Sequence, residues 1–215
     1  MLTKALGSDA AVRGLVNMDA QFGGTIDNPS ADVSTEVEGG GVGASTFDSL
    51  TGLFNLRNGI IDVNQLIVKK AIKNQEYKAS AKGSIPLKAL TASPDERLDD
   101  YEQFNLQISL DEADLSLLPI LSKQVDWAIG KTAGSLKVTG TLAHPLVNGT
   151  LNMPDGALKL KAVKTPVTEM KAAVRFTGDQ INIDTCTGKM GKGTYTLTGS
   201  TRFSGRGFFG YDFGL

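Results

Sequence analysis

The sequence predicts an all-β protein: an elongated antiparallel sheet of short-looped strands with one short helix. Three observations support this. Apolar and polar residues alternate along most of the chain, turn-forming residues separate the alternating runs, and helical periodicity is confined to one stretch. A strand with one dry face and one wet face requires such alternation, and short connections can join only antiparallel neighbours.

The alternation is clearest in residues 135–142, where Leu136, Val138 and Leu142 alternate with polar or small residues. Adjacent side chains of a strand point to opposite faces, so each such run predicts a strand with one apolar face. The other predicted strands contain residues 33–37, 104–110, 158–162, 170–176, 181–184 and 195–198.

The sharpest turn signal is Asn58-Gly59, which stands between two apolar runs. A type I′ hairpin turn needs positive φ at both central residues, and Asn-Gly is the pair that best tolerates this. From Ile61 and Val63 to Leu66 and Val68 the apolar phase slips by one residue. We therefore expect a hairpin at 58–59 and a β-bulge between Val63 and Leu66.

One stretch departs from period two. In residues 116–128 the apolar positions Leu117, Leu118, Leu121 and Val125 follow helical spacing, with Ser116 as a possible N-cap. This predicts a short amphipathic helix. It would serve either as a plug or spacer against a groove, or as ordinary packing between two parts of the sheet.

An internal repeat is visible in the turns. The segments 24–29, 56–61 and 81–84 match 140–145, 176–181 and 197–200, about 116 to 120 residues later. Repetition at a fixed period is typical of extended, stacked architectures. We therefore divide the chain into a first repeat at 1–90, a linker, strand and short helix at 91–131, and a second repeat at 132–215. We also expect the chain to be a fragment of a longer protein.

The composition excludes several functional classes. The net charge is -1, without the clustered basic surface that nucleic-acid binding requires. One Cys (Cys186) and one His (His144) cannot build a Cys/His zinc site or a disulfide within the chain. Residues 39–44 match a dinucleotide fingerprint formally, but no long helix follows to hold a pyrophosphate. We expect no enzyme activity, no cofactor and no metal.

Residues 134–151 carry a resemblance to a known family. Their pattern of alternating Leu and Val, Gly-Thr-Leu, a proline and then Gly-Thr-Leu again resembles the TamB family of the AsmA-like superfamily, and 114–121 is similar to the segment between that family's repeats. The family forms the inner-membrane component of the translocation and assembly module of diderm bacteria. The resemblance implies a sheet curled into an open, β-taco-like apolar trough in the periplasm, within a full-length protein anchored in the inner membrane.

The function that this resemblance implies is conduction of phospholipids between the inner and outer membranes in support of outer-membrane biogenesis. The expected partners are phospholipid acyl chains, an outer-membrane barrel protein of the assembly module, and flanking repeats of the full-length chain. The alternative is a structural or adhesive β-rich envelope protein, a solenoid or sandwich with an ordinary closed core.

The residues themselves support a groove, because helices able to cover the apolar face are nearly absent. A large dry face on a monomer needs an apolar occupant. The predicted lining of the groove consists of Phe54, Leu56, Phe104, Leu106, Ile108, Leu136, Val138, Leu158, Leu160, Val174, Phe176, Ile181, Ile183 and Leu197.

Overall fold

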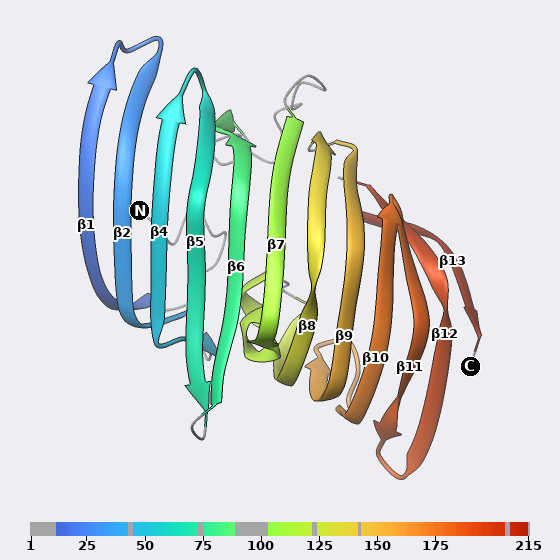
Figure 1. Ribbon diagram of the computed structural model, residues 1–215. Helices are drawn as coiled ribbons and strands as arrows, with labels where there is room; N and C mark the ends of the chain where they lie inside the picture. The colour runs from blue at the N-terminus through green and yellow to red at the C-terminus, as the bar shows by residue number, and fades with distance from the viewer. Residues whose placement is uncertain are drawn as a thin grey trace.

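The computed structural model describes residues 12–42, 45–72, 75–88, 103–121, 124–141, 143–204 and 207–214, and in them the all-β prediction is confirmed. They form one thirteen-stranded sheet, in which each strand but β3 follows its predecessor in chain order (Figure 1). The strands are β1 (Val12–Gly24), β2 (Pro29–Val42), β3 (Ser45–Thr46), β4 (Ser49–Arg57), β5 (Ile60–Ile72), β6 (Gln75–Pro86), β7 (Gln103–Asp114), β8 (Val125–Thr141), β9 (Pro145–Leu160), β10 (Val167–Gly178), β11 (Gln180–Met190), β12 (Gly193–Ser204) and β13 (Gly207–Gly214). The short β3 pairs with β2, beside the main path.

The strand register sorts the side chains into one apolar face and one polar face. Phe54 of β4 lies across from Val33 of β2 and from Val63 of β5. Its neighbour Asn55, which points to the other side, lies across from Asp32. The same sorting holds along the sheet, because all neighbouring pairs are antiparallel and share the alternation that the sequence shows.

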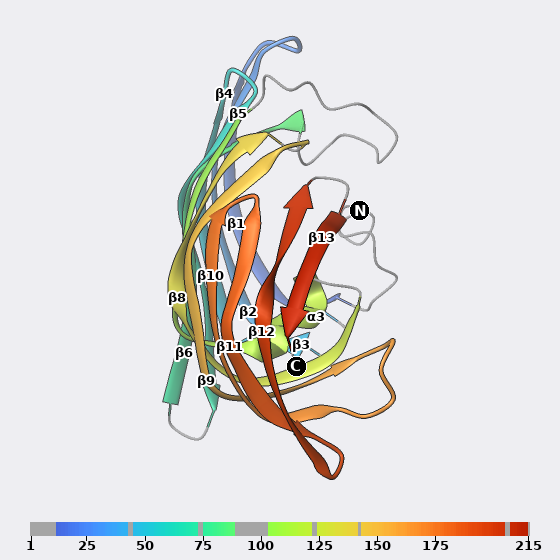
Figure 2. The same cartoon turned by 90° about the vertical axis from the view of Figure 1, so that its right-hand side faces the viewer.

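The sheet is curled along its strands into an open trough, with helix α3 (Leu118–Leu121) on the concave side (Figure 2). The preceding 3₁₀ turn η1 (Leu115–Leu117) identifies which face is concave. A side chain at Gly156 of β9 would meet Leu115 Cδ1 at 3.2 Å, and Gly156 pairs with Met170 of β10. Met170 shares its face with Val174, four residues further along the strand. The apolar face is therefore the concave face.

The hairpin and the bulge expected near residue 60 are both present. Asn58 and Gly59 have φ values of 51° and 72°, as a type I′ turn requires. Val63 of β5 pairs with Gly83 of β6, and Leu66 pairs with Ala81. Between these two pairs β5 therefore contains one residue more than β6. The phase slip in the sequence thus marks a true bulge.

The predicted helix at 116–128 is wrong in its extent. Among the described residues of this stretch, the helical conformation is confined to Leu115–Leu121, and Asp114, not Ser116, caps the 3₁₀ turn by accepting a hydrogen bond from the Ser116 N–H. Val125 and Ala128 belong to β8, where they pair with Leu160 and Leu158 of β9. β8 accommodates Asp126 as an extra residue between Val125 and Trp127, and the ladder hydrogen bonds to β9 outweigh the helical spacing of the leucines.

The internal repeat has a geometric counterpart in the turns. Thr25 N donates to Asn28 O at 3.1 Å, and Asn28 N donates to the Thr25 hydroxyl at 3.1 Å. In the matching turn, Thr141 N donates to His144 O at 3.3 Å, and His144 N donates to the Thr141 hydroxyl at 3.1 Å. Two segments far apart in sequence thus close their hairpins with the same pair of bonds.

A bulge repeats as well. β5 carries Asn64 as an extra residue opposite β4, and β11 carries Asp184 as an extra residue opposite β10. Each extra residue bonds to a side chain of the preceding strand, but in opposite directions, because Asn64 donates to Asn55 and Asp184 accepts from Arg175. The division into repeats at 1–90 and 132–215 stays a prediction. Residues 91–100, at the start of the predicted linker, lie outside the described residues.

Candidate functional site: the concave apolar face

The candidate site is a surface rather than a pocket, built from one side of every strand along the sheet. Its clearest element is a row of paired residues that runs from β1 to β13 through every intervening register. The row consists of Val16, Val37, Leu50, Val68, Ala79, Leu110, Gly134, Leu151, Val174, Ile183, Gly199 and Phe213. Each member is apolar or glycine, and strands lie about 4.8 Å apart, so the row is roughly 50 Å long.

The structure places the predicted lining residues on this face. Leu106 lies across from Val138, Ile108 from Leu136, and Phe176 from Ile181, all in rows beside the one just described. Leu56 lies across from Ile61, Phe104 from Gly140, and Cys186 from Leu197. Leu158 and Leu160 lie nearer the end of β9, across from Ala128 and Val125.

Several members of the surface were missed by sequence reasoning. Val16, Leu50, Val68 and Leu151 join the row through their register, although each lies in an alternating run that was visible in the sequence. Their positions could have been found by extending the alternation along each strand. Their alignment into one row could not, because it depends on where each bulge falls.

The exposure of the predicted lining separates it from a closed core. Each of the predicted lining residues is half-buried, and none of them is fully covered. Some buried apolar residues of the concave side lie near the helical segment, where Ala128 is 2% and Met170 5% exposed, and others lie toward the 58–59 hairpin, where Ala31 is 7% and Val63 4% exposed. At the edge of the sheet Phe22 is 82% exposed. A single sheet without a second layer gives this pattern.

The segment 114–121, which we call the strap, lies on the concave side at one end of the strands. Lys70 of β5 reaches it with an ammonium 2.7 Å from Asp114 Oδ2 and 2.6 Å from the Ser116 hydroxyl. Ser116 in turn donates to Asp114 from its backbone at 3.0 Å and from its hydroxyl at 2.6 Å. Burial alone would raise the Asp114 pKa, but the bonds from Lys70 and Ser116 outweigh it and hold the pKa below its usual value.

A second polar group lies near the strap. Lys131 of β8 pairs with Glu112 at 3.1 Å and stands 5.8 Å from the centre of the Tyr77 ring. Gln75 also donates to Glu112. These contacts join β6, β7 and β8 at the same end of the sheet, and they do not include a strap residue.

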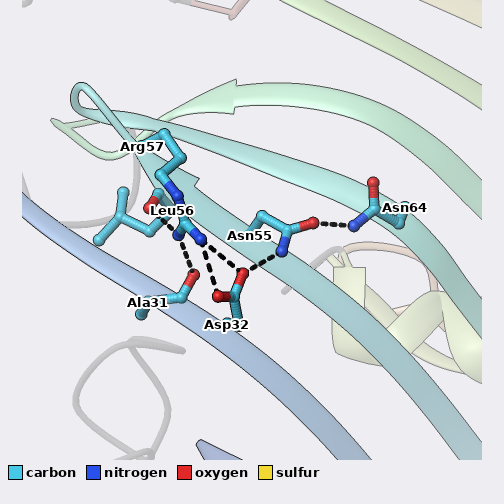
Figure 3. A network of polar contacts seen from close by, with 6 residues as sticks. All are labelled: Ala31, Asp32, Asn55, Leu56, Arg57 and Asn64. Atoms are coloured by element: carbon cyan, nitrogen blue, oxygen red, sulfur yellow. Dashed lines mark hydrogen bonds and ion pairs between the residues drawn. The ribbon is translucent and has the colours of Figure 1, made fainter. Parts of the chain in front are cut away.

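The convex face is polar and cross-linked between strands. Arg57 donates to both carboxylate oxygens of Asp32, at 2.9 and 2.7 Å, and to the Ala31 carbonyl at 2.9 Å (Figure 3). Asn55 donates to the same aspartate and accepts from Asn64 (Figure 3). These residues alternate with the apolar ones along β2, β4 and β5, so the convex face suits water and the concave face does not.

No chemistry-bearing arrangement stands on the apolar face of the described residues. Cys186 Sγ lies 3.8 Å from the Tyr195 hydroxyl, and burial together with this contact raises the Tyr195 pKa. A raised pKa keeps the phenol neutral and unreactive.

The described part of the chain contains no group of three or more His, Cys, Asp or Glu residues placed to hold a metal ion. Within the same residues, no helix has the length and apolar character needed to cross a membrane.

Comparison with known proteins gives one similarity. The chain is 20% identical over 220 residues to TIC236, a chloroplastic protein of Arabidopsis thaliana, and the match covers 80% of this chain. The chain spans about 10% of the length of that relative. TIC236 is a chloroplast homologue of bacterial TamB, so the similarity supports the resemblance to the TamB and AsmA-like family. No family model matches the chain, and no solved structure matches it.

Proposed function

We propose that the concave face is a segment of a hydrophobic groove that carries phospholipids between the inner and outer membranes of a diderm bacterium. The observation that carries the proposal is the uninterrupted apolar row from β1 to β13, whose members remain partly open to the trough. A half-open apolar surface about 50 Å long needs an apolar occupant, and an acyl chain can slide along it without specific bonds. The protein would act without catalysis.

The wider setting is part of the same proposal. The resemblance and the similarity to TIC236 favour an envelope protein, and we propose a periplasmic position within a full-length chain anchored in the inner membrane. Flanking repeats would extend the groove at β1 and β13, and an outer-membrane barrel protein would receive the lipid. Support for outer-membrane protein assembly would follow from this supply.

The alternative, a structural or adhesive protein with a closed core, is not favoured by an open sheet. A closed core would bury residues such as Val174 and Ile183 completely, whereas both are half-buried. The alternative therefore needs a covering layer. Among the described residues, the strap lies on the concave side together with the short strand β3, which contacts η1, and the strap occupies one end of the strands (Figure 2).

The test uses two adjacent residues of β10 that point to opposite faces. A photo-crosslinking amino acid at Val174 of the full-length protein should capture phospholipid in cells, and the same amino acid at Arg175 should not. Ile183 and Asn182 form a second matched pair, since they lie directly across from these two residues on β11. Mass spectrometry of the crosslinked protein identifies the adduct. Equal capture on both faces would contradict the proposal.

A further inference from the structure

The connection from β7 to β8 is built differently from the hairpins around it. The turn at Asn58-Gly59 joins its strands in two residues, whereas the β7 to β8 connection folds into η1 and α3 and lies under the concave face (Figure 2). At one side of the trough it reaches Lys70 of β5, and at the other side Leu115 reaches Gly156 of β9. The strap packs mainly on β8, and its contacts through the Lys70 side chain and Leu115 extend to β5 and to β9.

The strap is held by a buried polar clamp. The Asp114 side chain is 3% exposed and that of Lys70 is 16% exposed, so water screens their ion pair weakly. The Asp114 carboxylate also accepts both bonds from Ser116, which fix the first turn of the strap. Lys70 and Asp114 come from strands separated by β6, so the clamp ties the strap across the sheet rather than along one hairpin.

The position of the strap along the trough matters for anything that moves through it. β5 to β9 are the middle strands of the meander, so the strap lies about halfway along the apolar row. Beside it Met170 is 5% exposed, although four residues away on the same strand Val174 is half-buried and open to the trough. Leu115 of the strap lies against Gly156, which is directly across from Met170, so the concave face of β10 has a buried part next to the strap and an open part at Val174.

We propose that the strap is a constriction in the lipid path. It keeps acyl chains on the row that contains Val174 and excludes them from the covered part around Met170, and the Lys70–Asp114–Ser116 clamp keeps it closed. This inference rests on the proposed function, because it assumes that acyl chains occupy the groove. In this proposal the strap limits the width of the groove through which acyl chains pass.

The experiment places a small diazirine amino acid at Met170 or at Val174 of the full-length protein and measures phospholipid adducts in cells. With the clamp intact, we expect capture at Val174 and little capture at Met170. Lys70→Met removes the charge that holds Asp114 and Ser116. In that variant capture at Met170 should rise several-fold, while capture at Val174 should change little.

Lys131→Met is the matched control, because Lys131 pairs with Glu112 outside the strap and is not part of the clamp. Its adducts should equal those of the unmodified chain at both positions. Circular dichroism checks that the sheet survives. If Lys70→Met unfolds the protein, Ser116→Ala, which removes only the hydroxyl contacts of the clamp, takes its place.

The outcomes separate the two proposals. Equal capture of phospholipid at Met170 and Val174 in the unmodified chain overturns the proposed constriction but not the proposed groove. Capture at Met170 that stays low in both Lys70→Met and Ser116→Ala has the same meaning. A rise in capture at Met170 with Lys131→Met that equals the rise with Lys70→Met also overturns the constriction. Capture at neither position in any variant overturns the proposed function itself.

Discussion

Placing an arginine at Val174 tests whether the concave face is open. Val174 lies across from Leu151 and Ile183 within the apolar row, and it is half-buried. Full burial of a valine side chain contributes about 1.5 to 3 kcal/mol, so removal of a half-buried one costs about 1 kcal/mol. In an open trough the arginine stem can lie along the apolar surface with its guanidinium in water.

In a closed core the same substitution would cost more free energy of unfolding. There the same arginine is a buried charge without a partner, and such changes cost about 3–5 kcal/mol, a large part of the stability of an ordinary domain. Met170→Arg supplies this comparison within the same strand, because Met170 is 5% exposed and lies across from Gly156, against which Leu115 of the strap packs. We expect Val174→Arg to leave the sheet folded and Met170→Arg to destabilise it severely.

The assay is urea unfolding followed by circular dichroism in the strand region. Arg175→Ala is the reference for β10, because Arg175 lies on the convex face and pairs with Asp184 in solvent. In cells, Val174→Arg within the full-length protein should abolish its support of outer-membrane integrity although the protein is folded. A loss of stability at Val174 as large as that at Met170 would refute the open trough. A folded Val174→Arg variant that fully preserves integrity would refute the lipid path.

The remaining predictions concern stability. The lowered Asp114 pKa means that the clamp contributes stability above pH 4 or so, and that this contribution is lost as the pH falls through the lowered value. Asp114→Asn should therefore cost about 1–3 kcal/mol at neutral pH and flatten the acid limb of a stability profile measured by urea unfolding. Gly59→Ala should cost about 1 kcal/mol from its positive φ alone, since no atom lies within 4 Å of the new methyl group. Gly140→Ala should cost more in the same assay, because its methyl would meet the His144 carbonyl oxygen at 2.4 Å; equal costs would show that the second hairpin relaxes around the clash.

The sheet could be predicted from sequence because its determinants are local. Alternation assigns each residue of a strand to a face, and Asn58-Gly59 defines a turn by its own backbone preference. The bulge at Asn64 is also visible in the sequence, because the apolar phase slips there by one residue. The predicted extent of the helix was wrong because that prediction also relied on the local pattern alone. Val125 fits a helical stripe and a strand equally well, and pairing with Leu160 decides between them.

The strap could not be predicted, because it depends on distances that only the curled sheet creates. Lys70 and Asp114 are far apart in sequence and lie on strands that are not neighbours. Lys70 also falls in a run of basic residues that suggests a solvated rim. Only when the strands bend does the end of β7 come under the ammonium of β5. The sequence identified 116–128 as unusual without showing what it contacts.

The exposure pattern links the fold to the proposed path. If the concave face were the core of a sandwich, its most central residues would be its most buried, and the row through Val174 would be drier than the strap region. The structure has the reverse order, with burial at Met170 and partial exposure along the row. A sheet that buries its apolar face only in patches, such as those at Met170 and at Val63, and leaves the row through Val174 half-open over about 50 Å, has a surface that an elongated apolar molecule can cover and leave.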